Sequence, residues 1–370
     1  MLVHNEQSRR SHEQQKSSNN EYQRKSFSGQ KKVPLCKPFT ICTTDGYIVD
    51  ILGPYYATQN DASIMKEIMT ESNGLCNLMK KGDIFILDRG FRDVKNMLTE
   101  QGYGVLMPAL KGKRPQLSTI ESNDSRFVTK LRWVVEAIHG ILKQKYRLLD
   151  RKLDNKMLPK IGIYCKIASF LQNRYGKRLN SDAGRLDIIA QMKEKKNQEN
   201  SLSEEIEKHG WSRKKLIFSD ISTSDIFDFP EMTENDLHIL FTGSYQFSQA
   251  ISYLAEILNA DGSITAKYVK ERSNILKLSV KSRHINKKTY RCYIEYLPNT
   301  IGHSGVTRYA CECASGKRTV GCCSHVAALI YYLAHGRYLS KILKPAEILT
   351  NLFTKNEIHP IINENSDIDD

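Results

Sequence analysis

The residues best suited to chemistry are three cysteines and one histidine late in the chain. They are Cys311, Cys313, Cys323 and His325, spaced Cys-x-Cys-x(9)-Cys-x-His. Three thiolates and one imidazole make a tetrahedral Zn²⁺ set with no position left for water, so we expect a structural zinc rather than a catalytic one. The alternative is a group of free buried cysteines. Cys322 could replace Cys323, although only Cys323 has the Cys-x-His spacing.

Two carboxylates form a second candidate site. Asp88 follows the apolar run IFIL, and Glu136 lies 48 residues later in a segment with helical apolar spacing. A carboxylate just outside a strand end is a common place for chemistry in an α/β sheet. Arg132 lies one helical turn before Glu136, so a plain intrahelical ion pair is the alternative interpretation.

Strands and helices alternate around these carboxylates, which indicates an α/β layer. Asp45-Gly46 is a strong hairpin turn signal, and Asn60 or Asp61 is suited to cap a helix. Cys292, on a strand expected in the second half of the chain, is expected in its core. The elements expected around the carboxylates are a hairpin over 33–56, a helix over 60–74, a strand over 82–91, a helix over 92–102, a strand over 103–110 and a long helix over 122–146.

The order of several segments resembles that of one transposase family. The string IFILDRGFRD, then LMP, then SRFVTKLRWVVEAIHGILKQKYRLLD resembles the second half of a Harbinger-type DDE superfamily endonuclease domain. GPYYATQNDASIM resembles the family's Pro-Gly-x-x-x-Asp segment. The resemblance covers roughly residues 17–178.

The resemblance implies an RNase H-like fold in which three carboxylates hold two divalent ions, normally Mg²⁺ or Mn²⁺. Such ions activate water or a 3′-hydroxyl and stabilise the leaving oxygen of a DNA strand. Asp88 and Glu136 would be two of the metal ligands. Asp61 would be a supporting carboxylate, and Arg132 and Lys143 would contact phosphate.

The family's first aspartate has no counterpart here. It belongs to an Asp-Gly-Thr-like element on the first strand, and no aspartate lies before Asp45. Asp45 is accounted for by the turn, and Asp50 lies on the returning strand. We therefore expect a sheet truncated at its N-terminus, without its central strand, and severely reduced magnesium binding and hydrolysis. A decayed or domesticated transposase derivative and a Met1 internal to a longer gene both stay open as explanations.

The Cys3His spacing and its flanks resemble the SWIM zinc finger over roughly residues 268–340. This resemblance implies a small α+β zinc module that binds DNA or protein. A basic stretch beside it is either a solvated strand face or a phosphate-contacting face. The candidates for nucleic-acid contact are Lys277, Lys281 and Arg283, together with Lys111, Lys113 and Arg114.

The composition favours an acidic polymer as the partner. The 370 residues include 55 Lys and Arg against 41 Asp and Glu, a net charge of +14 that favours phosphate backbones. No apolar run approaches the roughly 20 residues that a membrane helix needs, which excludes a helical membrane protein. The start has no apolar signal region. Clustered cysteines indicate a reducing compartment, and we expect a nuclear protein.

We expect five parts and a binding function. The predicted function is zinc-dependent DNA binding by a transposase-derived protein whose DDE domain is inactive. Two alternatives stay open: an active Mg²⁺- or Mn²⁺-dependent endonuclease with the missing strand and aspartate supplied upstream, and a protein-interaction adaptor. The parts are a disordered or truncated start (1–26), an incomplete DDE domain (27–178), a charged linker (179–229), a SWIM-type module with its flanks (230–345) and an acidic tail (346–370).

Overall fold

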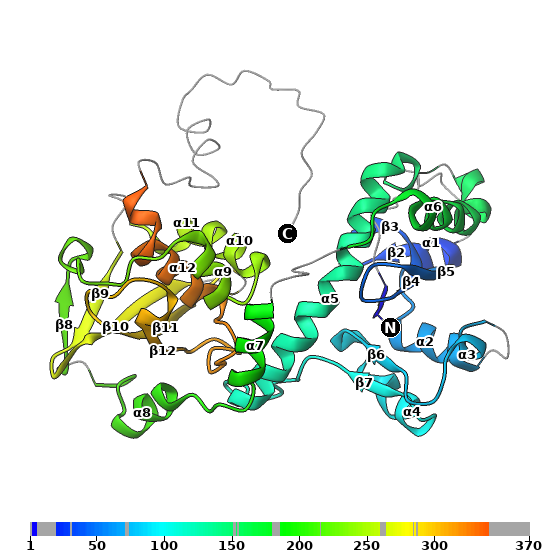
Figure 1. The fold of residues 1–370 in the computed structure, drawn as a ribbon. Helices are drawn as coiled ribbons and strands as arrows, with labels where there is room; N and C mark the ends of the chain where they lie inside the picture. Colours follow the sequence, from blue (N-terminus) through cyan, green and yellow to red (C-terminus); the bar gives the residue numbers. More distant parts are fainter. Residues whose placement is uncertain are drawn as a thin grey trace, which may run out of the picture. The chain divides into compact units, whose positions relative to one another are not determined.

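The computed structural model contains two compact units, each built on a five-stranded sheet (Figure 1). The first unit comprises Met1–Lys113 and Glu121–Gly184, and the second comprises Arg114–Ile120 and Arg185–Asp370. The structure describes residues 2–5, 20–29, 32–70, 74–150, 153, 155–179, 186–214, 216–259, 264–283, 285 and 288–339. The expected acidic tail, 346–370, lies outside these residues.

The sheet of the first unit is mixed, with strand order β5-β4-β1-β6-β7. β1 is antiparallel to β4 and parallel to β6, β5 is antiparallel to β4, and β7 is parallel to β6. Its strands are β1 (Leu2–Asn5), β4 (Cys36–Cys42), β5 (Ile48–Tyr56), β6 (Ile84–Ile86) and β7 (Gly104–Leu106). A separate short pair is formed by β2 (Phe27–Ser28) and β3 (Val33–Pro34).

The central place in this sheet is taken by β1, and the expectation of a missing central strand is wrong. Leu2–Asn5 pairs with β4 on one side and with β6 on the other. Four residues within a polar stretch are too short to show a strand period, so the pattern could not reveal them. The expected disordered start also contains α1 (Asn20–Ser26), while residues 6–19 lie outside the described part.

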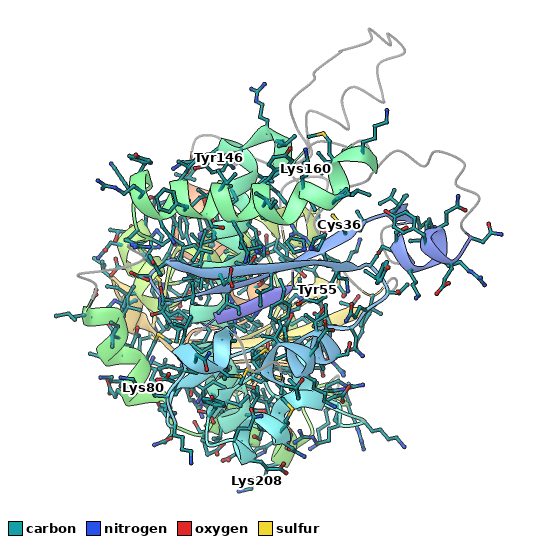
Figure 2. All side chains as sticks on the ribbon, turned by 90° about the vertical axis from the view of Figure 1, so that its right-hand side faces the viewer. Cys36, Tyr55, Lys80, Tyr146, Lys160 and Lys208 are labelled. Carbon is teal, nitrogen blue, oxygen red and sulfur yellow. The ribbon has the colours of Figure 1, made fainter. Side chains whose placement is uncertain are left out.

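Helices cover both faces of the first sheet. One apolar core joins Phe39 and Ile41 of β4 to α2 (Asp61–Thr70), η1 (Arg89–Val94) and α4 (Lys95–Glu100). Another joins the opposite face to α5 (Thr119–Lys145) and α6 (Ile161–Tyr175). In Figure 2 the strands that carry Cys36 and Tyr55 run below the helical segments marked by Tyr146 and Lys160. The remaining short helices are α3 (Leu75–Leu78), η2 (Arg147–Leu149) and η3 (Asn155–Lys160).

The local turn and cap signals act as predicted. At the β4–β5 turn the amide of Thr43 donates to the carbonyl of Tyr47, and Gly46 adopts a φ of 83°, which glycine tolerates. At the start of α2 the side chain of Asn60 accepts from the amide of Ser63 at 2.6 Å. The hairpin and the helix after it are therefore confirmed.

The second unit has an antiparallel sheet of order β12-β11-β10-β9-β8. Its strands are β8 (Phe218–Ile221), β9 (Ala266–Val269), β10 (Arg272–Lys281), β11 (Thr289–Tyr296) and β12 (Val306–Cys311). Its helices are α7 (Leu186–Lys195), α8 (Ser201–His209), η4 (Thr223–Asp225), α9 (Glu234–Leu240), α10 (Ser244–Ser252), α11 (Leu254–Ile257), η5 (His303–Gly305), α12 (Ser324–Ala334) and η6 (Gly336–Tyr338).

The main core of this unit lies between the sheet and the helices α9 to α12. α12 is apolar all round, and from His325 to Ala334 every residue is buried, as expected of a helix enclosed on all sides. A smaller core on the other face of the sheet packs Leu202 and Ile206 of α8 with Trp211, Phe218 and Tyr293. Both faces of the sheet are therefore covered.

The segment 179–229, which we expected to be a charged linker, contains α7, α8 and the edge strand β8. This segment is folded rather than a linker because an acidic side chain of α8 forms ion pairs with arginines of the sheet. Arg308 of β12 donates to Glu205 of α8 at 3.0 Å and to Glu295 of β11 at 2.6 Å. Arg272 of β10 bonds the same two carboxylates. Charge in this segment thus anchors a helix.

No helix in the described ranges is long and apolar enough to cross a membrane.

Candidate functional site

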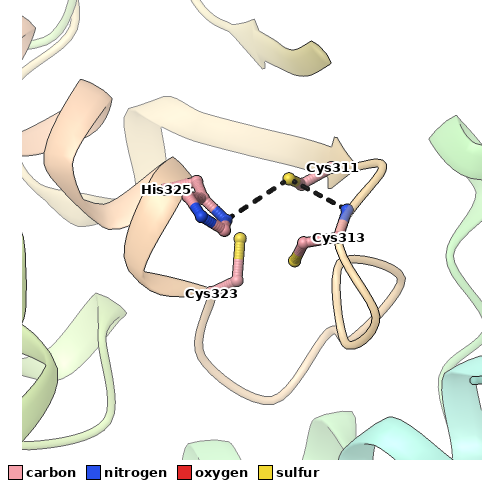
Figure 3. Close-up of side chains that lie close together, drawn as sticks. All are labelled: Cys311, Cys313, Cys323 and His325. Atoms are coloured by element: carbon pink, nitrogen blue, oxygen red, sulfur yellow. Dashed lines mark hydrogen bonds between the residues drawn. The ribbon is translucent and has the colours of Figure 1, made fainter. Parts of the chain in front are cut away.

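The three cysteines and the histidine come together at one end of β12 (Figure 3). Cys311 is the last residue of β12, and Cys313 follows in the turn after it. Cys323 is the residue before α12 and His325 the second residue of that helix. The four ligand atoms lie within 4.8 Å of one another, and all four residues are buried. The turn and the helix start thus bring together residues from two separate segments.

The turn that holds the Cys-x-Cys pair depends on Gly316. The amide of Cys311 donates to the carbonyl of Gly316 at 3.1 Å, and the amide of Gly316 donates to the carbonyl of Cys313 at 3.0 Å. A Cβ on Gly316 would overlap the carbonyl oxygen of Cys311. Only glycine therefore fits this knuckle, by which we mean residues 311–316.

The ambiguity between Cys322 and Cys323 has a structural answer. Cys323 contributes its sulfur to the group, whereas Cys322 is buried beside it outside the group. The carbonyl of Cys322 accepts from Gln246 at 3.1 Å and from Arg318. Cys322 thus helps to position the loop before α12.

The pKa values of the three sulfurs are shifted by burial and by their hydrogen bonds with one another. Burial raises the pKa of the Cys311 thiol, and a hydrogen bond with Cys311 is the main cause of the raised pKa of Cys313. Hydrogen bonds with Cys311 and Cys313 hold the pKa of Cys323 below its usual value. Zinc binds thiolates, so the metal must displace the protons of buried thiols, which makes binding stronger at higher pH.

His325 directs one ring nitrogen towards the sulfurs, and its imidazole packs against two tyrosine rings. Its Nδ1 lies 3.8 Å from the sulfur of Cys311, while its buried Nε2 has no hydrogen-bond partner. The rings of Tyr253 and Tyr290 lie 5.1 Å and 4.7 Å from the imidazole, measured between centroids. A buried imidazole and three buried thiols are donors that zinc prefers, so this group could hold zinc.

A fifth sulfur lies beside the group. Cys292 of β11 is fully buried, as the expected core position requires, but its sulfur is 3.5 Å from that of Cys311. The two residues are directly opposite in the β11–β12 ladder. Burial raises the pKa of Cys292 to about 11. The spacing of the cysteines in the sequence does not reveal that Cys292 lies beside Cys311. A predicted pairing of the two strands could have revealed it.

In the first unit Asp88 and Glu136 both contact Arg132. Nη1 of Arg132 lies 2.8 Å from Oε1 of Glu136 and 3.5 Å from Oδ2 of Asp88. The intrahelical pair therefore exists, but the same guanidinium also reaches the end of β6, where Asp88 accepts from the amide of Arg89. α5 and β6 thus position two carboxylates around one cation.

Asp61 contacts the loop after Asp88. Its Oδ1 lies 3.7 Å from the ammonium of Lys37, a buried group whose pKa is lowered by burial. Its Oδ2 would lie 3.1 Å from a Cβ on Gly90, two residues after Asp88. Lys143 lies in the last turn of α5, seven residues after Glu136. Within the described residues no third ligand joins Asp88 and Glu136 in a group of metal-ligand spacing.

The aspartates considered as substitutes have other partners. Asp45 accepts from Thr43 and from the amide of Tyr47, and the bond from Thr43 is the main cause of its lowered pKa. Asp50 lies 3.7 Å from the ammonium of Lys166. Both lie in the hairpin, as the sequence indicated.

The register of β1 places its residues beside those of β6. Leu2 is level with Ile86 in the parallel ladder of β1 and β6. Two residues further along each chain are His4 and Asp88. The four residues of β1 are Leu, Val, His and Asn, so the central strand exists but carries no carboxylate.

Two of the candidate nucleic-acid contacts are engaged within the second unit. The ammonium of Lys277 lies 4.0 Å from the ring centroid of Phe218 and donates to the carbonyl of Trp211. The guanidinium of Arg283 stacks 4.0 Å from the ring centroid of Tyr253 and donates to Ser252. Sequence alone could not show this, because the covering segments lie elsewhere in the chain.

The other basic candidates differ in exposure. Lys281 is exposed at the end of β10, and Lys113 and Arg114 are exposed ahead of α5, whereas Lys111 is partly buried. Exposed lysines and arginines are the groups able to contact phosphate. Contact with phosphate stays a prediction for all six residues.

Comparison with known proteins finds a family similar to the N-terminal part of the chain. Residues 12–173 match the family model described as DDE superfamily endonuclease. No curated protein and no solved structure matches the chain. Residues 12–173 are therefore similar to DDE superfamily endonucleases, a family whose enzymes use divalent metals, and a buried Cys3His group near the C-terminus could hold zinc.

Proposed function

We propose that this protein binds DNA through a zinc-stabilised C-terminal unit and that its DDE domain no longer cleaves DNA. The observation that carries the proposal is the contrast between the two sites. The Cys3His group is closed, buried and complete for zinc. The carboxylate pair shares one arginine and gains no third ligand among the described residues.

The zinc in this proposal is structural. Cys311, Cys313, Cys323 and His325 would hold it, and it would tie the end of β12 to the start of α12. Because all four ligand positions are filled by protein, no position remains for a substrate or a reactive water. The spacing and the flanking strand and helix support assignment to the SWIM type, for which a nuclear location is the expected setting.

DNA as the partner is supported by the family and by charge. The DDE domain match suggests nucleic acid, and the chain carries a net charge of +14. Binding through phosphates should weaken with salt, because each neutralised phosphate releases bound counterions and adds about 0.9 to the log–log slope.

The test compares DNA affinity among the wild type, Cys313→Ser and Asp88→Ala over a range of salt concentrations. We expect about one zinc per chain in the wild type, lost together with most DNA affinity in Cys313→Ser. Asp88→Ala should bind DNA with the wild-type affinity and salt slope. A metal-free protein that folds and binds DNA normally would contradict the proposal, and salt-insensitive binding would favour a protein-interaction adaptor.

One observation favours active cleavage as the second candidate. Asp88 and Glu136 come from different elements yet meet at one cation, as two ligands of a catalytic metal would. The central strand β1 also removes the expected gap in the sheet. Mn²⁺-dependent nicking of a plasmid, abolished by Asp88→Ala and by Glu136→Gln, would establish this candidate. Its absence in the wild type would exclude the candidate for this chain.

A further inference from the structure

One short segment of the chain belongs to a different unit from its neighbours in sequence. Arg114–Ile120 follows β7 and runs into α5, both of which lie mainly in the first unit. The segment itself belongs to the second unit, although it falls inside the region that matches the endonuclease family, 12–173. The segment belongs to the second unit because it contacts residues 311–314 there.

The segment is hydrogen-bonded to the Cys-x-Cys knuckle. Nε2 of Gln116 donates to the carbonyl of Cys311 at 2.7 Å and to that of Cys313 at 2.8 Å. The amide of Leu117 donates to the carbonyl of Ala314 at 3.0 Å. Leu117 is 2% exposed, so the residue next to Gln116 is buried where these hydrogen bonds form.

The two bonds of Gln116 depend on the shape of the knuckle. One amide group can reach both carbonyls only when Cys311 and Cys313 turn their carbonyls to the same side. The closed turn around Gly316 produces this arrangement. A metal held by Cys311 and Cys313 would favour the same turn, because both sulfurs must then point to one ion.

We propose that Gln116 is a positioning residue for the knuckle, so that zinc binding and docking of Arg114–Ile120 stabilise each other. This inference rests on the zinc site proposed above. By linkage, the factor by which zinc strengthens docking equals the factor by which docking strengthens zinc binding. Zinc therefore orders the stretch of chain that leads directly into α5, the helix of Glu136.

The substitution Gln116→Glu tests the contact with little change in shape. It removes both donated hydrogen bonds and places carboxylate oxygens against two carbonyl oxygens. We expect zinc affinity to fall about tenfold, the lower end of the range for groups that orient metal ligands. Gln198→Glu makes the same change at an exposed position of the same unit and should leave zinc affinity unchanged.

Hydrogen exchange of the full chain gives a readout that does not depend on any variant. With zinc bound, the amide of Leu117 should exchange slowly, and removal of zinc by a chelator should speed its exchange at least tenfold. The amides of β10, such as those from Leu276 to Val280, should change much less. Equal acceleration in β10 would mean general unfolding and would overturn the inference.

The outcomes separate this inference from the zinc proposal. Suppose that the wild type binds about one zinc per chain. If zinc removal then leaves the exchange rate of the Leu117 amide unchanged, or if Gln116→Glu binds zinc with wild-type affinity, the inference is overturned and the zinc site remains supported. A wild-type chain that binds no zinc overturns both.

Discussion

At the scale of single residues, the candidate zinc site depends on backbone geometry as much as on its donors. Gly316 allows the knuckle to close, and Cys323, just before α12, has a pKa lowered by hydrogen bonds with Cys311 and Cys313. The imidazole of His325 packs against the rings of Tyr253 and Tyr290, and Arg283 stacks on the ring of Tyr253. Residues other than the four candidate donors thus help to position those donors.

Gly316→Ala should weaken zinc binding without removing a donor. The added methyl group overlaps the carbonyl of Cys311, so the knuckle must open and the two sulfurs separate. We expect a fall of about 10- to 100-fold in zinc affinity, as for other changes that misplace ligands, measured by competition with a chromogenic chelator. Gly29→Ala is the matched control, because nothing lies within 4 Å of its new methyl group. Unchanged zinc affinity in Gly316→Ala would refute this view of the knuckle.

Arg132→Met should change metal binding at the carboxylate pair. The guanidinium that bridges Asp88 and Glu136 is lost, so a divalent cation can take its place. We expect Mn²⁺ affinity to rise, as measured by electron paramagnetic resonance, with a stability loss of at most about 1 kcal/mol because the carboxylates are half exposed. Arg92→Met, at an exposed pair with Asp93, is the control. Equal Mn²⁺ affinity in both variants would argue against a metal site here.

At the scale of elements, local signals could be predicted and distant pairings could not. The hairpin at Asp45-Gly46 and the long helix α5 follow from turn chemistry and apolar period. β1 could not be predicted because four residues are too few to show a strand's alternation of apolar and polar residues. Only its pairing with β4 and β6 defines it as a strand. The four metal donors lie in two short motifs, whereas Gln116 is 195 residues from Cys311. No spacing rule connects such a pair.

The ion-pair network between α8 and the sheet should make the second unit sensitive to acid. Bonds from Arg308 are the main cause of the lowered pKa of Glu295. A lowered folded-state pKa contributes stability above the unfolded-state value of about 4.3, and this stability is lost as the pH falls through the folded-state value. Glu295→Gln should cost about 1–2 kcal/mol at pH 7 and should flatten the loss of stability below pH 5.

Unfolding in urea, followed by Trp211 fluorescence, measures this effect. Trp211 packs in the core beneath α8, and replacing Trp133 by phenylalanine removes the other tryptophan. Glu204→Gln, an exposed neighbour on α8, is the control. A Glu295→Gln variant whose stability falls with acid as steeply as that of the wild type would contradict the role of Glu295.

At the scale of the whole molecule, the chain combines a region similar to DDE superfamily endonucleases, residues 12–173, with a second unit that could hold zinc. The central claim is that this combination binds DNA and leaves it intact. The charge of +14 and the family match support binding. The shared Arg132, and the lack of a third ligand beside Asp88 and Glu136 among the described residues, support loss of cleavage. The two properties can be observed in one sample.

The most direct measurement mixes the zinc-loaded protein with an end-labelled DNA duplex and Mn²⁺, and follows binding by anisotropy and strand integrity on a denaturing gel. We predict a salt-sensitive rise in anisotropy, lost after zinc removal, with strands that stay intact. Nicked strands that require Asp88, or zinc-loaded protein that leaves the duplex unbound, would contradict the account.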